Sequence, residues 1–392
     1  MANKPRIRFK GFTEDWEQRK LTSFIQRVKG NDGRMDLPTL TISASEGWLN
    51  QKDRFSANIA GSEQKNYTLL RQGELSYNHG NSKLAKYGVV YVLKDYKEAL
   101  VPRVYHSFKV DESYDALFVE YYFSTKRPDR ELAKLVSSGA RMDGLLNIGY
   151  DEFTNISIAV PTFSEQRQIV ALLRRFDKFI TLHQCKLEKL KLTKKTLLQK
   201  LFPKNGKHIP EIRFKGFTDA WEQRKLGDIV DFLDGQRKPL KESDRIKGKY
   251  PYYGASGIID YINDYLFDEN LVLLSEDGAN IIDRNYPVCF IATGKYWVNN
   301  HAHVLKVKTG VIDKFICESL ERLDYTKFNT GTAQPKLNQD ICQKIVITIP
   351  NEDEQKCISE FLDRINNIIT LHQRKLERLQ EVKKGLLQKM FV

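Results

Sequence analysis

The chain of 392 residues lacks the segments that would carry it to or across a membrane. No apolar run approaches the ~18 residues that a membrane-spanning helix needs. The charged stretch from Met1 to Lys10 has no apolar core of the kind found in secretory signals. We therefore expect a cytoplasmic protein.

Cysteine is scarce, and its spacing excludes two common structural uses. The five cysteines are odd in number and never form a C-x-x-C pair. This pattern favours reduced thiols over a disulfide framework or a zinc knuckle. The five are Cys185, Cys289, Cys317, Cys342 and Cys357.

Catalytic and cofactor motifs are also missing. Every Gly-Lys pair is followed by His or Tyr, so there is no phosphate-binding G-x-x-x-x-G-K-[ST] loop and no ATP-driven motor is expected. There is no G-x-G-x-x-G loop, and no Pro-Pro pair of the kind found in amino-methyltransferase motifs. The stretch 128–134 has the wrong spacing for a nuclease cluster, and His301-Ala302-His303 lacks an evident third metal ligand. We expect a non-catalytic chain with no metal or cofactor of its own.

The sequence does contain two internal repeats. Residues 5–21 (PRIRFKGFTEDWEQRKL) and 210–226 (PEIRFKGFTDAWEQRKL) differ at only three positions. Residues 161–202 and 350–391 align without gaps and share ITLHQ, KLE and LLQK. The intervening segments, 22–160 and 227–349, show little likeness to each other. Two copies of one scaffold thus present different surfaces, which suits a protein that reads two different targets.

The second repeat predicts two long helices. Apolar positions alternate at spacings of three and four, a 3.5-residue period typical of a coiled-coil seam. Each helix of about 38 residues would be ~57 Å long, and antiparallel pairing would place the variable regions at opposite ends. Polar residues interrupt both seams at equivalent places (Lys194 and Lys383, and two histidines that we expect to be packed in the seam). The seam residues are Leu173, Phe176, Ile180, His183, Leu187, Leu190, Leu362, Ile365, Ile369, His372, Leu376 and Leu379.

Positive charge is concentrated on these helices. The net charge is +13, of which residues 165–202 carry +7 (ten Lys/Arg, three Asp/Glu) and residues 354–391 carry +3 (eight and five). The excess favours a polyanionic partner such as nucleic acid. A solvated coiled-coil exterior, a rod over DNA and a docking face for an acidic subunit all fit this charge. The variable regions are nearly neutral.

Both variable regions read as mixed α/β folds with short strands. The order of elements matches between them, which predicts homologous folds with diverged surfaces. In the first we expect strands at 84–93, 101–110 and 155–160 and helices at 116–123 and 128–136. In the second we expect strands at 270–274, 288–293, 303–307 and 344–349 and a helix at 313–323.

Loops in these regions combine amides, aromatics, cations and glycine. Asn and Gln can bond adenine bidentately, Arg or Lys guanine, and glycine lets the backbone approach phosphate closely. Each loop alone is only a turn, and the architecture is what points to DNA. The candidate DNA-binding residues are Asn78, His79, Asn81, Ser82, Lys83, Arg141, Tyr252, Tyr253, Asp277, Asn280, Asn299, Asn300, His301, Gln334 and Lys336.

The whole chain resembles the specificity subunit of type I restriction–modification systems. The motifs that carry the resemblance are GFTEDWEQRKL and GFTDAWEQRKL, TGTAQPKLN, IVITIPNEDEQKCISEFLD, ITLHQRKLERLQ and KKGLLQKMF. The first half departs from the pattern at 141–147, where RMDGLLN replaces the QPKLN of 334–338. The two halves are therefore expected to read different DNA sequences.

The resemblance implies an α/β (α+β) fold in which two homologous target recognition domains are separated by two long antiparallel coiled-coil helices with pseudo-twofold symmetry. Its parts would be a first recognition domain (1–160), a central helix (161–203), a second recognition domain (204–349) and a C-terminal helix (350–392). Each domain would read half of a bipartite double-stranded DNA site, and the helices would set the spacer.

The resemblance also implies partner subunits. Two modification subunits would carry S-adenosylmethionine and the adenine methyltransferase chemistry. Two restriction subunits would carry ATP- and Mg-dependent translocation and cleavage.

Two other classes stay open on the residues alone. One is a stand-alone DNA-binding protein without enzyme partners, which co-purification of a methyltransferase subunit would exclude. The other is a structural coiled-coil adaptor, against which salt-dependent binding to duplex DNA would count.

Overall fold

The computed structural model describes all residues except 1–3, 56–60, 81, 137–144 and 205–206. The chain forms two compact units, which are described separately below. Unit 1 comprises residues 1–184 and 374–392, and unit 2 comprises residues 185–373. No helix in the described part of the chain is long and apolar enough to span a membrane.

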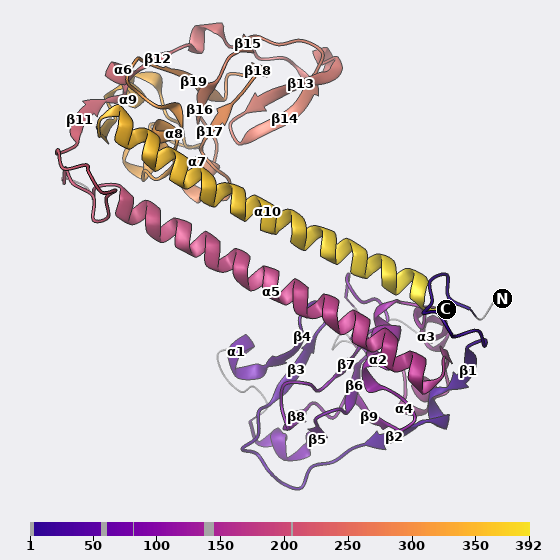
Figure 1. Cartoon of the computed structure of the whole chain (residues 1–392). Helices are drawn as coiled ribbons and strands as arrows, with labels where there is room; N and C mark the ends of the chain where they lie inside the picture. Colours follow the sequence, from indigo (N-terminus) through magenta and orange to yellow (C-terminus); the bar gives the residue numbers. More distant parts are fainter. Residues whose placement is uncertain (1–3, 56–60, 81, 137–144, 205–206) are drawn as a thin grey trace. The chain divides into compact units, whose positions relative to one another are not determined.

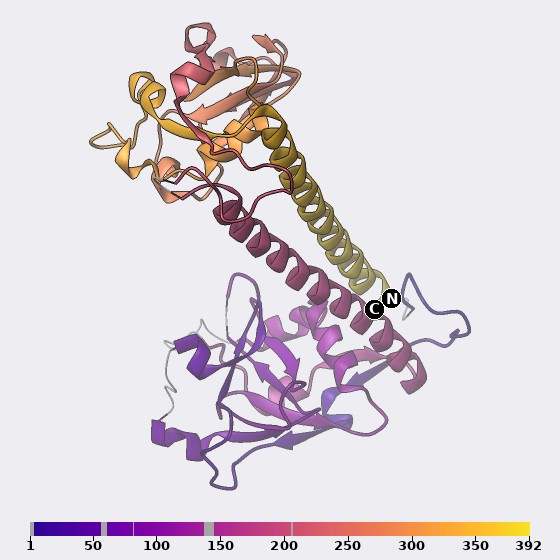
Figure 2. The same cartoon turned by 60° about the vertical axis from the view of Figure 1, so that its left-hand side comes forward.

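Unit 1 is built on an antiparallel four-stranded sheet in the order β2-β9-β6-β7. In both views this sheet lies on one side of the N-terminal half of the long helix α5 (Figures 1 and 2). Helices α2 and α3 complete the apolar core. The elements are β1 Glu17–Lys20, β2 Ile25–Val28, β3 Leu40–Ser43, β4 Gly47–Asn50, α1 Gln51–Phe55, β5 Thr68–Arg71, β6 Leu75–Asn78, β7 Val89–Val92, β8 Glu98–Val101, β9 His106–Val110, α2 Ala116–Ser124, α3 Asp129–Leu135, α4 Tyr150–Thr154, β10 Ser157–Val160 and α5 Phe163–Leu201.

Unit 2 repeats this main sheet and has a second four-stranded sheet, whereas unit 1 has the two-stranded pairs β3-β4 and β5-β8. The order β12-β19-β16-β17 corresponds to the sheet of unit 1, and a further sheet runs β14-β13-β18-β15. The elements are β11 Glu222–Lys225, α6 Leu226–Ile229, β12 Val230–Phe232, β13 Lys247–Gly254, β14 Gly257–Ile262, β15 Phe267–Asp268, β16 Leu271–Ser275, α7 Asn280–Asp283, β17 Cys289–Ala292, β18 Lys295–Val298, β19 Ala302–Val307, α8 Asp313–Glu321, α9 Gln339–Lys344, β20 Val346–Ile349 and α10 Glu352–Met390.

The two main sheets share their strand register. Ile25 faces Val110 at the start of the β2–β9 pair, as Val230 faces Val307 in β12–β19. The register of β6 on β9 matches that of β16 on β19, with Tyr77↔His106 equivalent to Leu274↔His303. The expectation that the variable regions are homologous folds is therefore confirmed at the level of individual strand pairs.

The first repeat closes each domain. Its strand β1 pairs antiparallel with β10, and β11 pairs with β20 in the equivalent register, Glu17↔Val160 against Glu222↔Ile349. The repeat therefore joins the beginning of each variable region to its end. Only three of its positions differ between the copies because it performs the same structural task twice.

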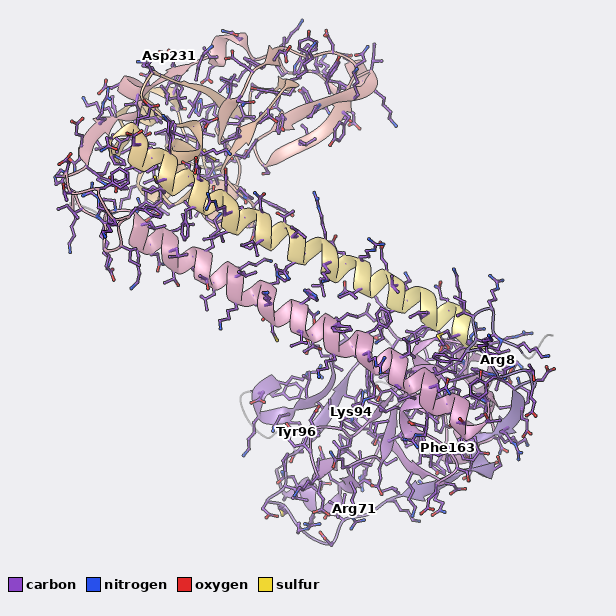
Figure 3. The ribbon with its side chains drawn as sticks, in the orientation of Figure 1. Arg8, Arg71, Lys94, Tyr96, Phe163 and Asp231 are labelled. Carbon is purple, nitrogen blue, oxygen red and sulfur yellow. The ribbon has the colours of Figure 1, made fainter. Side chains whose placement is uncertain are left out.

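The same repeat is tied to the start of a long helix by a buried ion pair. Arg8 donates two hydrogen bonds to the Glu165 carboxylate at 2.7 and 2.8 Å, and Arg213 donates two to Glu354 at 2.7 Å each. The two glutamate side chains are only 1% exposed. Figure 3 labels Arg8, and Phe163 at the start of α5. Such bidentate pairs fix geometry as well as charge.

Both long helices contribute to both units. Unit 1 contains the first part of α5 and the last part of α10, and unit 2 contains the remaining parts. In unit 1, Leu173 near the start of α5 packs in one core with Met390 at the end of α10. In unit 2, Leu201 at the end of α5 packs with Leu362 near the start of α10. The helix ends within each unit therefore lie antiparallel.

The predicted seam positions all avoid the surface. Leu173, Leu187, Leu362 and Leu376 are buried, and the other eight, both histidines included, are half-buried. By contrast, apolar residues of the same helices outside the seam are exposed, such as Leu182 at 55% and Leu371 at 68%. Pairing of the seams along the full helices stays a prediction.

Several boundaries differ from the sequence expectations. The helices are one residue longer than predicted. Their first turns are capped by Thr162 and Asn351, whose side-chain oxygens accept from the backbone N–H of Glu165 and Glu354. The expected strand at 84–93 is only Val89–Val92. The hairpin β13–β14 was not expected, because Gly and Pro interrupt its alternation of polar and apolar residues.

Candidate nucleic-acid interface

In unit 2, the loops that follow three strands meet at one end of the domain. After β18, Asn299 N–H donates to the Tyr253 carbonyl in β13 at 3.0 Å. The Glu276 N–H, just after β16, donates to the His301 carbonyl at 2.9 Å. A β-bridge then joins Asp277 to Lys336 in the loop before α9. The fold thus assembles residues from four separate segments into one surface.

This surface offers both hydrogen-bond donors and acceptors. His301, Gln334 and Lys336 are exposed. The His301 Nδ1 lies 2.8 Å from a carboxylate oxygen of Asp277. The Lys336 ammonium lies 3.5 Å from Glu276 Oε1. The charge of Lys336 is therefore balanced locally by Glu276, in agreement with the near-neutral composition of the variable regions.

Beneath the surface lies a buried network of charged groups. His303 Nδ1 is 2.5 Å from Asp234 Oδ2, and its Nε2 is 2.7 Å from the Leu337 carbonyl oxygen. Arg237 lies 2.6 Å from Glu276 Oε2 and 3.4 Å from Asp234 Oδ2. The His303 ring is 1% exposed, so no ligand on the surface can touch it.

The network contains side chains that could ligate a metal, but it already contains a positively charged group. One ligand atom from each of Asp234, Glu276 and His303 lies within 4.8 Å of the others. The Arg237 guanidinium, however, already lies between the two carboxylates. A metal cation would have to displace that guanidinium, so the arrangement is an ion-pair network.

The network keeps His303 protonated. Burial opposes the charged ring, but the hydrogen bond and the charge of Asp234, with a further contribution from Cys342, outweigh it and raise the pKa of His303 to about 10. Burial likewise opposes ionisation of Asp234, yet His303, the Val304 N–H and Arg237 lower the pKa of that carboxyl below its usual value. Each group thus stabilises the charged form of the other.

In unit 1 the equivalent loops meet in the same way. A β-bridge joins Gly80, just after β6, to Leu145, and the Leu146 N–H donates to the His79 carbonyl at 2.8 Å. The Asn78 amide donates to the Ile42 carbonyl at 3.2 Å and accepts from the Gly80 N–H at 3.1 Å. This corner therefore has the same backbone plan as that of unit 2.

The buried histidine of unit 1 that is equivalent to His303 is uncharged. His106 occupies the strand position of His303, and its Nε2 lies 2.8 Å from the Ile148 carbonyl oxygen. Its ring stacks on His79 with centroids 4.9 Å apart. Burial lowers the pKa of His106 to about 4, assisted by the nearby His79 and Arg27 and opposed by the Ile148 hydrogen bond. The ring is therefore uncharged at neutral pH.

Three of the predicted DNA-binding residues lie in the interior, and for them the interpretation is corrected. His79 is 4% exposed and both ring nitrogens lie against carbonyl oxygens, of Leu146 and Val104. Tyr252 is 1% exposed, and its hydroxyl accepts from the Leu240 N–H. Asn299 is 4% exposed and accepts from the His301 N–H. Polar residues near strand ends in these domains shape the loops from within.

The other candidates fall into two groups. Exposed residues are Ser82, Lys83, Asn300, His301, Gln334 and Lys336, and partly exposed ones are Asn78, Tyr253, Asp277 and Asn280. The Asn280 amide closes its own loop by bonding the Tyr286 backbone twice, at 2.7 and 3.0 Å. Asn81 and Arg141 lie outside the described residues.

Sequence reasoning missed the buried groups that hold these loops. Asp234 and Arg237 come from the short turn after β12, and His106 begins β9, where nothing in the local sequence marks a partner. The signal that could have found them is the equivalence of His106 and His303. It becomes visible only when the two variable regions are aligned by strand register.

Comparison with known proteins adds independent findings. The family model described as the type I restriction modification DNA specificity domain matches residues 218–381. A Haemophilus influenzae protein assigned as a type I restriction enzyme specificity subunit is 33% identical over 162 residues, 41% of this chain and 41% of that protein. The type I restriction enzyme MjaVIII specificity subunit of Methanocaldococcus jannaschii is 23% identical over 427 residues, 95% of this chain and 91% of that subunit.

A solved structure shares the fold. The crystal structure of the type I restriction–modification S subunit from M. genitalium superimposes with a TM-score of 0.66, over 99% of both chains at 14% identity. The matched domain, the curated relatives and the common fold agree with the motifs of the sequence. Residues 218–381 thus match the DNA specificity domain of type I restriction–modification systems, and the whole chain is similar to the specificity subunits of these systems.

Proposed function

We propose that this chain is the non-catalytic DNA-reading subunit of a type I restriction–modification complex. Each domain reads one half of a bipartite duplex site, and the two long helices hold the halves at a fixed distance. The observation that carries the proposal is the combination of one frame with two different loop surfaces. The strand registers are equivalent, whereas Gly80 and Leu145 stand where unit 2 has Asp277 and Lys336.

The charge distribution supports different DNA contacts for the loops and for the long helices. Base edges are read by hydrogen bonds, and phosphates attract cations regardless of sequence. The loops of unit 2 present an amide, an imidazole and a carboxylate-paired lysine, a set suited to base edges. The long helices carry most of the net positive charge and would supply contacts that do not depend on sequence.

Repeated apolar residues on the helices support docking of partner subunits. Phe179 and Leu182 of α5 are 52% and 55% exposed, and the equivalent Ile368 and Leu371 of α10 are 44% and 68% exposed. Exposed apolar patches commonly mark protein–protein contacts. Two equivalent pairs suit two copies of one partner, which we identify with the modification subunits that bind S-adenosylmethionine. Restriction subunits, with ATP and Mg, would complete the complex.

Co-expression with a cognate methyltransferase subunit tests the assignment. We expect the two proteins to co-purify and to methylate adenines in one bipartite sequence, mapped on genomic DNA. Replacement of Leu182 and Leu371 by Asp should abolish co-purification, whereas Asp at exposed Thr181 and Thr370 should not. Tight, specific DNA binding with no partner captured would instead support a stand-alone DNA-binding protein.

A matched insertion tests the role of the helices. One additional heptad in both α5 and α10 lengthens each by ~10.5 Å, which corresponds to about three base pairs of B-DNA. We expect the unspecified spacer to grow by about that amount while both half-sites keep their sequences. Altered half-sites, or an unchanged spacer, would contradict the ruler role.

A further inference from the structure

Two buried histidines occupy the same place under the recognition loops of the two domains. His303 in β19 pairs across the sheet with Leu274, and His106 in β9 pairs with Tyr77, at equivalent register positions. The Nε2 atoms lie 2.7 Å from the Leu337 carbonyl oxygen and 2.8 Å from the Ile148 carbonyl oxygen. In both domains the acceptor lies in the segment between the variable loop and the final strand.

In unit 2 this acceptor, Leu337, anchors the C-terminal end of the exposed loop. The Leu337 N–H donates to the Glu276 carbonyl at 2.7 Å, while its own carbonyl faces His303. The Lys336 carbonyl accepts from the Thr330 N–H at 2.8 Å, which closes the loop on itself. A displacement of Leu337 would therefore be passed directly to the exposed Gln334 and Lys336.

The ring of His303 is itself held from the other side. Its Nδ1 faces Asp234, whose other oxygen accepts from the Val304 N–H at 2.9 Å. Because both ring nitrogens are engaged and the ring is 1% exposed, it cannot contact DNA and has one orientation. It can influence recognition only through the backbone that it holds.

The equivalent device in unit 1 uses two aromatic rings. His106 faces the Ile148 carbonyl oxygen, and the stacked His79 faces the Leu146 carbonyl oxygen at 2.7 Å. These acceptors follow directly on the bridge at Leu145. The Leu146 carbonyl, which is equivalent to that of Leu337, is therefore held by His79, and His106 holds the carbonyl two residues later in the same segment.

We infer that His303 and His106 are positioning residues for DNA specificity, each of which fixes the recognition loop of its own domain from the interior and so controls the reading of one half-site. This inference rests on the proposed function. It adds that specificity depends on residues that never touch the DNA, and that the two half-sites can be loosened independently.

The test uses the chain in complex with its methyltransferase subunits and a plasmid library randomised over both half-sites. Methylated adenines are sequenced to obtain base discrimination at every position. For His303→Ala we expect discrimination to fall by about tenfold or more at the half-site read by unit 2 and to stay unchanged at the other. His106→Ala should give the reverse pattern. His303→Gln should retain part of the discrimination, because its amide N–H can still donate to Leu337.

Val304→Ala is the matched control. Val304 is fully buried in the same strand as His303, but it packs in a different apolar cluster from Leu337, and its side chain does not hold Leu337. The substitution should cost stability without loss of discrimination. Amide hydrogen exchange gives a second readout: His303→Ala should accelerate exchange at Lys336 and Leu337, and the control should not.

If His303→Ala fails to fold, Gly331→Ala provides an independent variant. A Cβ on Gly331 would lie 1.8 Å from the Gln334 carbonyl oxygen, so the exposed loop must move while the buried network stays intact. It should relax only the half-site of unit 2. Equal relaxation of both half-sites would overturn the inference, as would unchanged discrimination in folded His303→Ala or, where that variant does not fold, in Gly331→Ala. A wild-type complex that methylates no bipartite site would contradict the proposed function itself.

Discussion

The two units hold equivalent loops with different polar groups. In unit 1 two stacked histidines, of which His106 is uncharged at neutral pH, hold the segment that follows the variable loop. In unit 2 a protonated histidine, two carboxylates and an arginine hold the equivalent segment. The backbone plan is common, so the difference shows that this fold tolerates exchange of polar chemistry wherever the hydrogen bonds to the backbone are preserved.

A second comparison concerns the lysines that interrupt the seam. In unit 1, Lys383 pairs with Asp177 of α5, to which the Tyr121 hydroxyl also donates at 2.5 Å. In unit 2, Lys194 lies 3.2 Å from Glu318 of α8, the position equivalent to Tyr121. The lysine is at the same helix position in both units, whereas its carboxylate partner is on the long helix α5 in unit 1 and on α8 in unit 2. The repeated lysine therefore joins helix and domain through different partners.

The largest loss of stability should come from breaking the buried arginine–glutamate ion pair that both units contain. Removing Glu165 or Glu354 leaves a largely buried arginine without its partner, which costs about 3 to 5 kcal/mol. We expect Glu165→Ala to destabilise unit 1 and Glu354→Ala to destabilise unit 2 by similar amounts in urea unfolding followed by hydrogen exchange. Glu17→Ala, which removes an exposed partner of Arg19, is the control and should have no measurable effect. Clearly unequal losses would show that the two copies of the frame are not equivalent.

The pH dependence of stability should separate the two domains. The pKa of His106 is lowered to about 4 in the folded chain, so its contribution is present above the unfolded value near 6.5 and is lost as the pH falls toward 4. The loss is on the order of 2 to 3 kcal/mol. The pKa of His303 is raised to about 10, so its contribution is complete below 6.5 and is lost as the pH rises through 10.

Urea unfolding of each unit between pH 4 and pH 10 measures these slopes. Asn in place of His106 should flatten the acid limb of unit 1, and Gln in place of His303 should flatten the alkaline limb of unit 2. The other limb is the internal control in each case. Parallel pH profiles for the two units would refute the contrast between them.

The smallest effect should come from moving the carboxylate. Asp177→Asn breaks the partly exposed pair with Lys383 and should cost about 1 kcal/mol. Adding Tyr121→Glu recreates the arrangement of unit 2, in which the carboxylate stands on the domain, and should recover most of that loss. Tyr121→Phe is the control for removal of the hydroxyl. A double variant less stable than Asp177→Asn alone would show that the two arrangements are not interchangeable.

The regular parts of this fold could be predicted from the sequence because their signals are local. The repeated segment 161–202, with its alternating spacing of apolar residues, predicts α5 nearly to its ends. The order of strands and helices in the variable regions follows in the same way. The repeats show directly that the frame is used twice.

The long-range ion pairs and the inward-facing site residues could not be predicted, because their partners are far apart in the chain. Lys194 meets Glu318 across 124 residues, and Lys383 meets Asp177 across 206. His79 and Asn299 have the composition of contact residues, yet the ends of β6 and β18 direct them inward. A loop sequence therefore predicts which groups are available but not which face solvent.

The central claim is that one frame carries two independent readers, and a domain exchange tests it most directly. Residues 22–160 are replaced by the corresponding segment of another specificity subunit, and methylated adenines are mapped for the complex with its methyltransferase subunits. We predict that one half-site changes while the other half-site and the spacer stay the same. A change in both half-sites would contradict the account.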